Sequence, residues 1–189
     1  MNDTTVAARL RLAAEAHERM AAAGGTAIGA AGQAMIDALA AGRTILAFGN
    51  GGSAAGAQHF VAELVVRFER ERRGLAAIAL TTDTSVLTAA GNDLGFDRLF
   101  ARQVEALGRA GDVALGITTS GTSPNVVRAL ETANARGLVT IALTGRDGGE
   151  AGKLARLHVN VPEDRTALVQ EVHTTIVHVW CELIDAALQ

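Results

Sequence analysis

From position 43 onward, short apolar runs alternate with longer segments of helical character, and this alternation restricts the fold more than any other feature. Five runs indicate strands, over residues 44–48, 76–80, 112–117, 139–143 and 157–161. They are continuously apolar, which is typical of parallel strands covered on both faces. Four further segments indicate helices, over residues 53–69, 97–107, 124–135 and 166–188. The sequence therefore predicts a doubly wound α/β fold, with a mostly parallel five-stranded sheet flanked by helices.

The first 42 residues precede this alternation and form an Ala-rich amphipathic stretch. Apolar residues recur at helical spacing from Val6 and again from Ile28, with Gly24 and Gly25 between the two sets. We expect two helices, separated at these glycines, that pack on the core or against another subunit. No linker or repeat follows, so residues 1–189 are expected to form a single domain. Within it, residues 1–42 are a helical extension and residues 43–189 are the α/β core.

Composition excludes several classes of protein. A net charge of −3 gives no electrostatic reason to expect direct nucleic-acid binding. Cys181 is the only cysteine, which excludes an intrachain disulfide and fits a reducing cytoplasm. The first residues contain no apolar core of a secretory signal, and no window reaches the length of a membrane span. Hydrophobic residues make up 49%, which leaves room for apolar surface that an oligomer would cover.

Two turns that directly follow strands have the composition of anion-binding loops. Residues 49–53 follow the first strand and are rich in glycine, while residues 118–123 follow the third and supply five hydroxyls. Glycines allow close approach, helix N-termini attract anions, and Ser53 either caps the next helix or donates to a ligand oxygen. One such turn alone is explained by helix capping; two at equivalent places favour a phosphate site near the switch point of the sheet. Neither contains the lysine of a nucleotide P-loop.

Several polar residues are candidates for chemistry. His59 and Glu63 share one helix face and could bind a metal, serve as acid and base, or simply form a polar surface. Gln170 and His178 are separated by about 12 Å along an ideal helix. One metal therefore reaches both only if the helix bends or different subunits contribute, and otherwise only one of them binds. A third polar loop, 91–95, is either an ordinary turn or a site for sugar hydroxyls.

In order and spacing, these segments resemble the phosphoheptose isomerase family, whose members carry a sugar-isomerase (SIS) domain. The resemblance covers nearly the whole chain and rests on residues 49–53, 59–63, 91–96, 111–123, 143–149 and 170–173 with His178. It implies isomerisation of D-sedoheptulose 7-phosphate to D-glycero-D-manno-heptose 7-phosphate, an early step of ADP- or GDP-heptose biosynthesis for lipopolysaccharide. It also implies a cytoplasmic homotetramer with active sites at subunit interfaces and one zinc ion per subunit.

The resemblance further assigns roles to single residues. It makes Glu63 and His178 the acid–base pair that moves a proton through an enediolate. Its zinc positions match His59, Glu63, Gln170 and His178. Its substrate positions match Asn50, Gly51, Gly52, Ser53, Glu63, Asn92, Asp93, Thr118, Thr119, Ser120, Ser123 and Gln170. The chain departs from the family pattern at Thr118 and Thr122, where serine or asparagine is common, and we expect a modest effect on phosphate binding.

Two other functions fit parts of the sequence. A sister SIS family, which binds the bacterial replication initiator, resembles residues 53–60 and 77–83. That family generally lacks the second histidine and departs from the turn at 49–53, whereas this chain keeps both, so the enzyme is favoured. A regulatory SIS module that senses a sugar phosphate without turnover would need the hydroxyl-rich turn but neither Glu63 nor His178.

Overall fold

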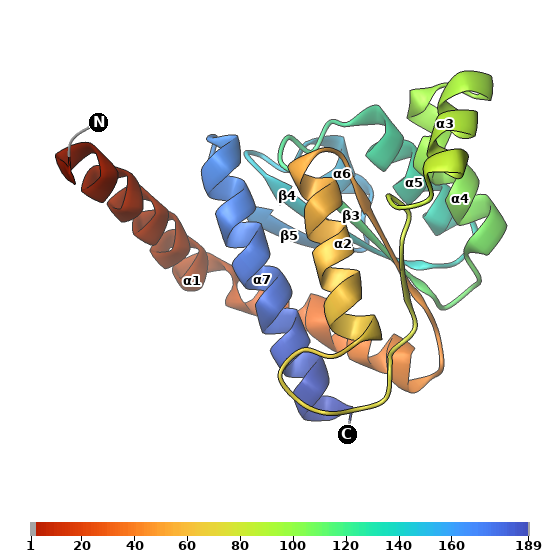
Figure 1. Ribbon diagram of the computed structural model, residues 1–189, viewed down its shortest axis with the longest axis horizontal. Coiled ribbons are helices and arrows are strands. Elements are labelled where there is room, and N and C mark those ends of the chain that lie inside the picture. Colours follow the sequence, from red (N-terminus) through yellow and green to blue (C-terminus); the bar gives the residue numbers. More distant parts are fainter. Residues whose placement is uncertain (1–2, 189) are drawn as a thin grey trace.

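The computed structural model describes residues 3–188, in which five parallel strands form one sheet in the order β2-β1-β3-β4-β5 (Figure 1). The strands are β1 (Ile45–Gly49), β2 (Ala77–Ala79), β3 (Val113–Thr118), β4 (Val139–Gly145) and β5 (Leu157–Val161). All four pairings between neighbouring strands are parallel. The predicted doubly wound α/β fold with a five-stranded sheet is confirmed.

Helices cover both faces of the sheet (Figure 1). The helices are α1 (Asp3–Ala40), α2 (Gly52–Val65), α3 (Thr84–Asp93), α4 (Leu99–Leu107), α5 (Pro124–Ala135), α6 (Gly149–Leu154) and α7 (Thr166–Ala187), with a 3₁₀ turn (Phe96–Arg98) before α4. One apolar core lies between the sheet and α1, α2 and α7, and a second lies between the sheet and α3 to α6. Within residues 3–188, no helix is long and apolar enough to cross a membrane.

The central strands are largely apolar because their two faces pack against different cores, whereas the edge strand β5 also contains His158 and Asn160. In β1, Ile45 and Ala47 belong to the core beneath α1, α2 and α7, whereas Leu46 and Phe48 belong to the other. Successive side chains of a strand point to opposite faces, so both sets must be apolar. This arrangement leaves the carboxyl ends of the strands, where the turns begin, as the places at which polar residues can gather.

The N-terminal region is a single helix, and the predicted break at Gly24 and Gly25 is wrong. A glycine inside a helix costs about 1 kcal/mol relative to alanine, which tertiary packing can offset. Met20 and Met35, on either side of the glycines, are buried in the core. The indole Nε1 of Trp180 also donates to the carbonyl of Ile28, 3.0 Å away, and ties α1 to α7. These contacts carry the helix through both glycines.

Other differences concern element ends and short helices. Helix α2 ends at Val65 rather than at residue 69, and α4 begins at Leu99 after the 3₁₀ turn. Helices α3 and α6 were not expected, and residues 91–93, interpreted as a loop, are the last turn of α3. Asp83 begins α3 by accepting a hydrogen bond from the amide of Val86 at 3.0 Å. Such short helices depend on caps and neighbours, and their own apolar pattern is weak.

Candidate active site

The two glycine- and hydroxyl-rich turns lie next to each other at the switch point of the sheet. From β1 the chain continues to β2 on one side and later returns to β3 on the other. In the register between these strands, Gly49 at the end of β1 pairs with Ile117 near the end of β3. Ligands of open parallel sheets bind in the crevice that such a reversal creates. The predicted placement of both turns at equivalent strand ends is confirmed.

The first turn leads directly into α2. Gly51 is the N-cap of this helix, so Ser53 does not cap it; Ser53 is instead buried in the first turn of α2. Gln170 of α7 lies against Gly52, and a Cβ atom at that position would be 2.9 Å from its Oε1. Only glycine allows this approach. The turn therefore brings a helix N-terminus, with its favourable dipole for an anion, next to the Gln170 amide.

The hydroxyls of the second turn form a connected cluster. Thr118 Oγ1 and Ser123 Oγ are 3.1 Å apart, and Ser120 Oγ accepts hydrogen bonds from the amide and hydroxyl of Thr122 at 3.2 and 3.1 Å. Each hydroxyl can rotate its proton toward a ligand oxygen. The carbonyl of Gly121 accepts a hydrogen bond from the amide of Ala151 at 2.9 Å, which attaches the turn to α6. The cluster is thus a preformed set of donors on a fixed backbone.

A reciprocal amide pair joins the two turns. Asn50 donates to Oδ1 of Asn125 at 2.8 Å, and Asn125 donates back to Oδ1 of Asn50 at 2.9 Å. Asn125 is buried at the start of α5, directly after Pro124, which occupies the first turn of the helix. Sequence reasoning missed Asn125, because the asparagines are far apart in the chain. The pair also occupies the side-chain amide of Asn50, one of the candidate substrate residues.

We expect Asn125→Leu to destabilise the protein by about 1–3 kcal/mol and to raise KM. The substitution leaves the partly buried Asn50 amide without its partner and frees the two turns to move apart. Thermal unfolding and steady-state kinetics measure the two effects. In a double-mutant cycle, Asn50→Leu should cost much less in the Asn125→Leu background than in the wild type. Additive effects would show that the amide pair does not couple the turns.

Three of the candidate chemical residues come together where α2 and α7 run side by side (Figure 1). Nε2 of His59 lies 2.8 Å from Nε2 of His178, and Nδ1 of His59 lies 3.7 Å from Oε1 of Glu63. The two imidazole rings meet edge to face. His59 is exposed, while Glu63 and His178 are half-buried. The arrangement places two imidazoles at the mouth of a pocket and a carboxylate beside one of them, and these are groups that acid–base chemistry requires.

The pocket itself extends along α2 and α7, with a volume of about 600 Å³. Of the candidate residues, Gly52, Ser53, His59, Gln170 and His178 line it. Gln170 and His178 face it from positions two turns apart on one continuous helix. Asn92 and Asp93 are exposed at the end of α3, bonded to each other at 2.6 Å, and do not line this pocket. Glu63, Asn50, Gly51 and the candidate hydroxyls of residues 118–123 do not line it either, so the pocket of one chain contains only part of the candidate site.

His173, which also lines the pocket, is fixed as a neutral imidazole. Its Nε2–H donates to the carbonyl of Thr144 at 2.9 Å, at the end of β4. Burial lowers the pKa of His173 to about 4, against a smaller opposing effect of that carbonyl. Its Nδ1 is buried and has no hydrogen-bond partner within residues 3–188. Sequence analysis assigned His173 no role; in the structure its hydrogen bond joins α7 to the end of β4.

The side chains near the pocket are of types that bind zinc, but the distances between their ligand atoms do not match those of a zinc site. Across residues 3–188, no three His, Cys, Asp or Glu side chains are grouped closely enough to hold a metal. Two Zn–N bonds of about 2.05 Å at a tetrahedral angle would place the nitrogens about 3.3 Å apart. The imidazole nitrogens of His59 and His178 are 2.8 Å apart and would need to separate slightly. Two imidazoles and a carboxylate are a common ligand set of catalytic zinc.

Comparisons with known proteins agree with this geometry. The family model of the SIS domain matches residues 10–145. The chain is 58% identical to a phosphoheptose isomerase from Citrifermentans bemidjiense over 154 residues, which cover 82% of this chain and 80% of that protein. The solved phosphoheptose isomerase from Neisseria gonorrhoeae superposes with a TM-score of 0.92 and 46% identity, covering 97% and 98% of the two chains. The solved phosphoheptose isomerase from Francisella tularensis superposes with a TM-score of 0.94 and 40% identity, covering 98% of this chain and 100% of that one.

Proposed function

The chain belongs to the SIS domain family and, within it, to the phosphoheptose isomerases, and we propose that it converts D-sedoheptulose 7-phosphate to D-glycero-D-manno-heptose 7-phosphate. It is an aldose–ketose isomerase. The observation that carries the proposal is the combination of two donor-rich turns at the switch point with a carboxylate and two imidazoles along α2 and α7. A partner of the replication initiator would not need these groups, and the comparisons do not favour that role.

In this proposal the two turns hold the phosphate. The N-terminus of α2, from Gly51 to Ser53, supplies amides and a favourable dipole. Thr118, Thr119, Ser120 and Ser123 supply hydroxyls around it. Because the phosphate is remote from the reacting carbons, holding it orients the sugar without taking part in bond changes. Gln170, against Gly52, would bond to the sugar next to the phosphate.

Glu63 and His178 would move the protons. Glu63 takes a proton from C1 of the ketose, and His178 returns a proton to C2, through an enediolate. The hydroxyl proton on C1 passes to the oxygen on C2, so the atoms of the sugar are conserved, and solvent restores both side chains. Donors around the two oxygens would stabilise the charge of the enediolate. Asn92 and Asp93, at the exposed end of α3, would contact the sugar from a neighbouring subunit.

The donor set supports one zinc ion per subunit. His59, Glu63 and His178 would hold it, with Gln170 joining from another subunit, because Gln170 lies about 12 Å from His178 along the continuous helix α7. When bound, zinc would act as a Lewis acid on the sugar oxygens.

Purified protein is expected to contain about one zinc per chain and to lose activity when a chelator removes it. Because a bound metal stabilises only the folded state, the melting temperature should also fall and then recover when zinc is returned. Metal analysis, thermal unfolding and activity are measured on the same samples. If chelation leaves both metal content and activity unchanged, the zinc assignment is wrong.

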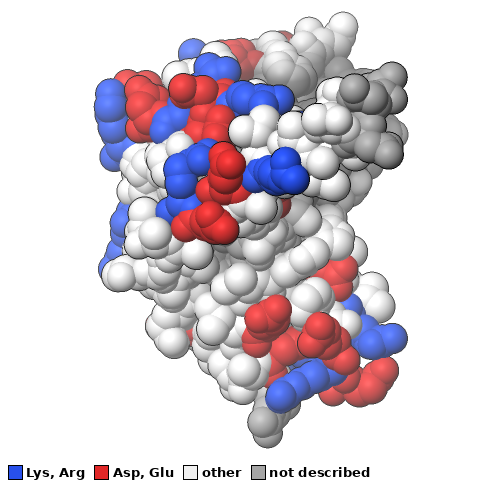
Figure 2. Space-filling model, turned by 90° about the vertical axis from the view of Figure 1, so that its left-hand side faces the viewer, with Lys and Arg blue, Asp and Glu red and all other residues white. Residues whose placement is uncertain are grey.

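We infer a homotetramer from the family resemblance, and two features of this chain support sites between subunits. Glu63 lies about 16 Å along α2 from Gly52, whereas an extended heptose 7-phosphate spans roughly 10 Å. A phosphate at Gly52 and a proton transfer at Glu63 therefore fit one substrate best if two chains contribute. The first half of α1 projects from the molecule with Val6 and Leu10 exposed (Figure 1). Figure 2 shows charged side chains in two groups on that side, with largely uncharged surface between them for another subunit to cover.

A cytoplasmic location is part of the same proposal. Cys181 is a free cysteine, which fits a reducing compartment. Burial, followed by the charges of Glu63 and Asp185, raises the pKa of the Cys181 thiol to about 12. The thiol therefore stays protonated and is not a candidate nucleophile.

The direct test is incubation of purified protein with D-sedoheptulose 7-phosphate in the presence of zinc, followed by NMR of the products. An aldoheptose 7-phosphate that accumulates to a constant ratio with the ketose is the expected result. A folded, zinc-loaded protein without turnover would contradict the proposal. It would then favour a sensor that binds the sugar phosphate without converting it.

A further inference from the structure

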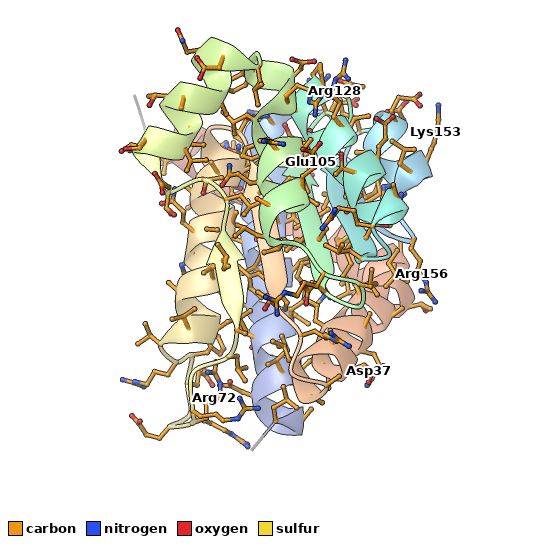
Figure 3. All side chains as sticks on the ribbon, turned by 90° about the vertical axis from the view of Figure 1, so that its right-hand side faces the viewer. Asp37, Arg72, Glu105, Arg128, Lys153 and Arg156 are labelled. Atoms are coloured by element: carbon orange, nitrogen blue, oxygen red, sulfur yellow. The ribbon has the colours of Figure 1, made fainter. Side chains whose placement is uncertain are left out.

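Between α2 and β2 the chain forms a charged loop, residues 66–76, which passes beneath the end of α7 (Figure 1). Figure 3 labels Arg72 at this end of the molecule. Nε of Arg72 donates to Oδ1 of Asp185 at 2.6 Å, and the two side chains are only 4% and 5% exposed. Buried ion pairs add little net stability, because the cost of desolvation offsets their attraction. The contacts of this pair instead indicate a role in geometry.

Arg72 holds the turn of α2 that carries Glu63. Its Nη2 donates to the carbonyl of Glu63 at 2.8 Å, and its Nη1 donates to the carbonyl of Leu64 at 2.9 Å. The last carbonyls of a helix have no partner within the helix and need one from outside. A planar guanidinium presents five donors in a fixed fork, so it can serve both carbonyls and the carboxylate at once. Arg72 therefore fixes the backbone from which the Glu63 side chain projects, together with the amide of Leu75, which also donates to the carbonyl of Leu64 at 3.0 Å.

Asp185 acts on His178 through the same loop. Its Oδ2 accepts hydrogen bonds from the amides of Glu69 and Arg70 at 3.3 and 3.4 Å. These amides directly follow Phe68, whose ring packs on the imidazole of His178 with centroids 5.7 Å apart. Burial alone would raise the pKa of Asp185, but the hydrogen bond and charge of Arg72 hold it below its ordinary value, so the carboxylate stays ionised. The ionised group keeps the Phe68 ring in place against His178.

We propose that the buried Arg72–Asp185 pair positions the two acid–base residues, Glu63 through the end of α2 and His178 through Phe68. The inference rests on the proposed function. Neither member of the pair touches the substrate, so both are positioning residues. The turns that would hold the phosphate lie at the opposite ends of α2 and α7, next to Gly52 and Gln170. Disturbing the pair should therefore lower kcat and leave KM nearly unchanged.

Asp185→Asn tests this, with Asp112→Asn as the matched control. Asp112 is 4% exposed and also accepts two backbone hydrogen bonds, from Thr44 at 2.9 Å and Arg109 at 2.8 Å. It lies just before β3, at the end of the sheet away from the pocket. Below the unfolding temperature of both variants, we expect Asp185→Asn to lower kcat at least tenfold with KM within twofold. Asp112→Asn should keep both constants within twofold of the wild type.

A second variant, Phe68→Leu, keeps the ion pair and tests the contact with His178 even if Asp185→Asn does not fold. Phe68→Leu should also lower kcat and leave KM nearly unchanged. Wild-type kcat in either folded variant, or equal losses in both Asn variants, would overturn the proposal. If the wild type itself shows no isomerase activity, the proposed function fails separately. In that case the amide hydrogen exchange of residues 60–76 and 174–182 tests the positioning role. Faster exchange in Asp185→Asn but not in Asp112→Asn would support that role, and unchanged exchange in Asp185→Asn would overturn it.

Discussion

Replacing Glu63 by Gln is expected to lower kcat by about 10²–10⁴-fold while KM changes little. Glutamine has the same shape as glutamate but cannot accept a proton from carbon at neutral pH. The Glu63 side chain lies 3.7 Å from Nδ1 of His59, outside hydrogen-bond distance, so the substitution breaks no hydrogen bond to that imidazole. Zinc is supplied in excess, because an amide is a weaker zinc ligand than a carboxylate. The turns that would hold the phosphate are untouched, because they lie at the other end of α2. Steady-state kinetics with D-sedoheptulose 7-phosphate measure both constants.

Glu131→Gln is a suitable control for this variant, since Glu131 is exposed on α5, on the opposite face of the sheet. It should retain wild-type kinetics. Full isomerase activity in a folded Glu63→Gln protein would remove Glu63 from the mechanism. It would then leave a histidine as the base that removes the proton.

Gly121→Ala should be among the most damaging small substitutions in the chain. Gly121 has a φ of +69°, which costs other residues about 1–2 kcal/mol. A Cβ atom there would overlap the carbonyl group of Gly148 and lie 2.7 Å from the amide nitrogen of Gly149. Because both obstacles are backbone, the hydroxyl-rich turn would have to shift, adding about 1–3 kcal/mol of strain. We expect the melting temperature to fall by about 5–15 °C and KM to rise.

The same substitution at Gly91 provides the contrast. Gly91 lies in α3, does not have a positive φ, and a Cβ atom would meet nothing within 4 Å. Alanine should stabilise the protein there by about 0.5–1 kcal/mol, through a lower entropy of the unfolded chain. Equal melting temperatures for the two variants in thermal unfolding would show that the contact of Gly121 with the β4–α6 turn is not tight.

Local sequence patterns were sufficient for the sheet and for the two turns. A parallel strand with two buried faces must be largely apolar. Turns that are rich in glycines and hydroxyls after two such strands, β1 and β3, favour a ligand site at that edge of the sheet. The continuous helix α1 was not predictable in this way, because packing around Met20 and Trp180 decides whether Gly24 and Gly25 interrupt it. Local propensity is a weak guide wherever tertiary contacts compete with it.

The two polar pairs that support the site could not be predicted from local sequence patterns. Asn50 and Asn125 are 75 positions apart, and Arg72 and Asp185 are 113 apart. Their side chains are of types that are usually exposed, so sequence reasoning treats each as a solvated residue. Only the three-dimensional structure shows that each pair is buried and complementary. Such pairs connect separate elements, which is why they can set the geometry of a site built from several of them.

The central claim is that the two turns hold the phosphate while Glu63 and His178 act on the carbons. A crystal structure of the Glu63→Gln variant with D-sedoheptulose 7-phosphate tests it most directly, because the variant should bind the sugar without converting it. We predict the phosphate within hydrogen-bond distance of Ser53 and the hydroxyls of residues 118–123, with C1 and C2 next to residue 63 and His178. A phosphate bound elsewhere, or sugar carbons distant from both residues, would contradict the account.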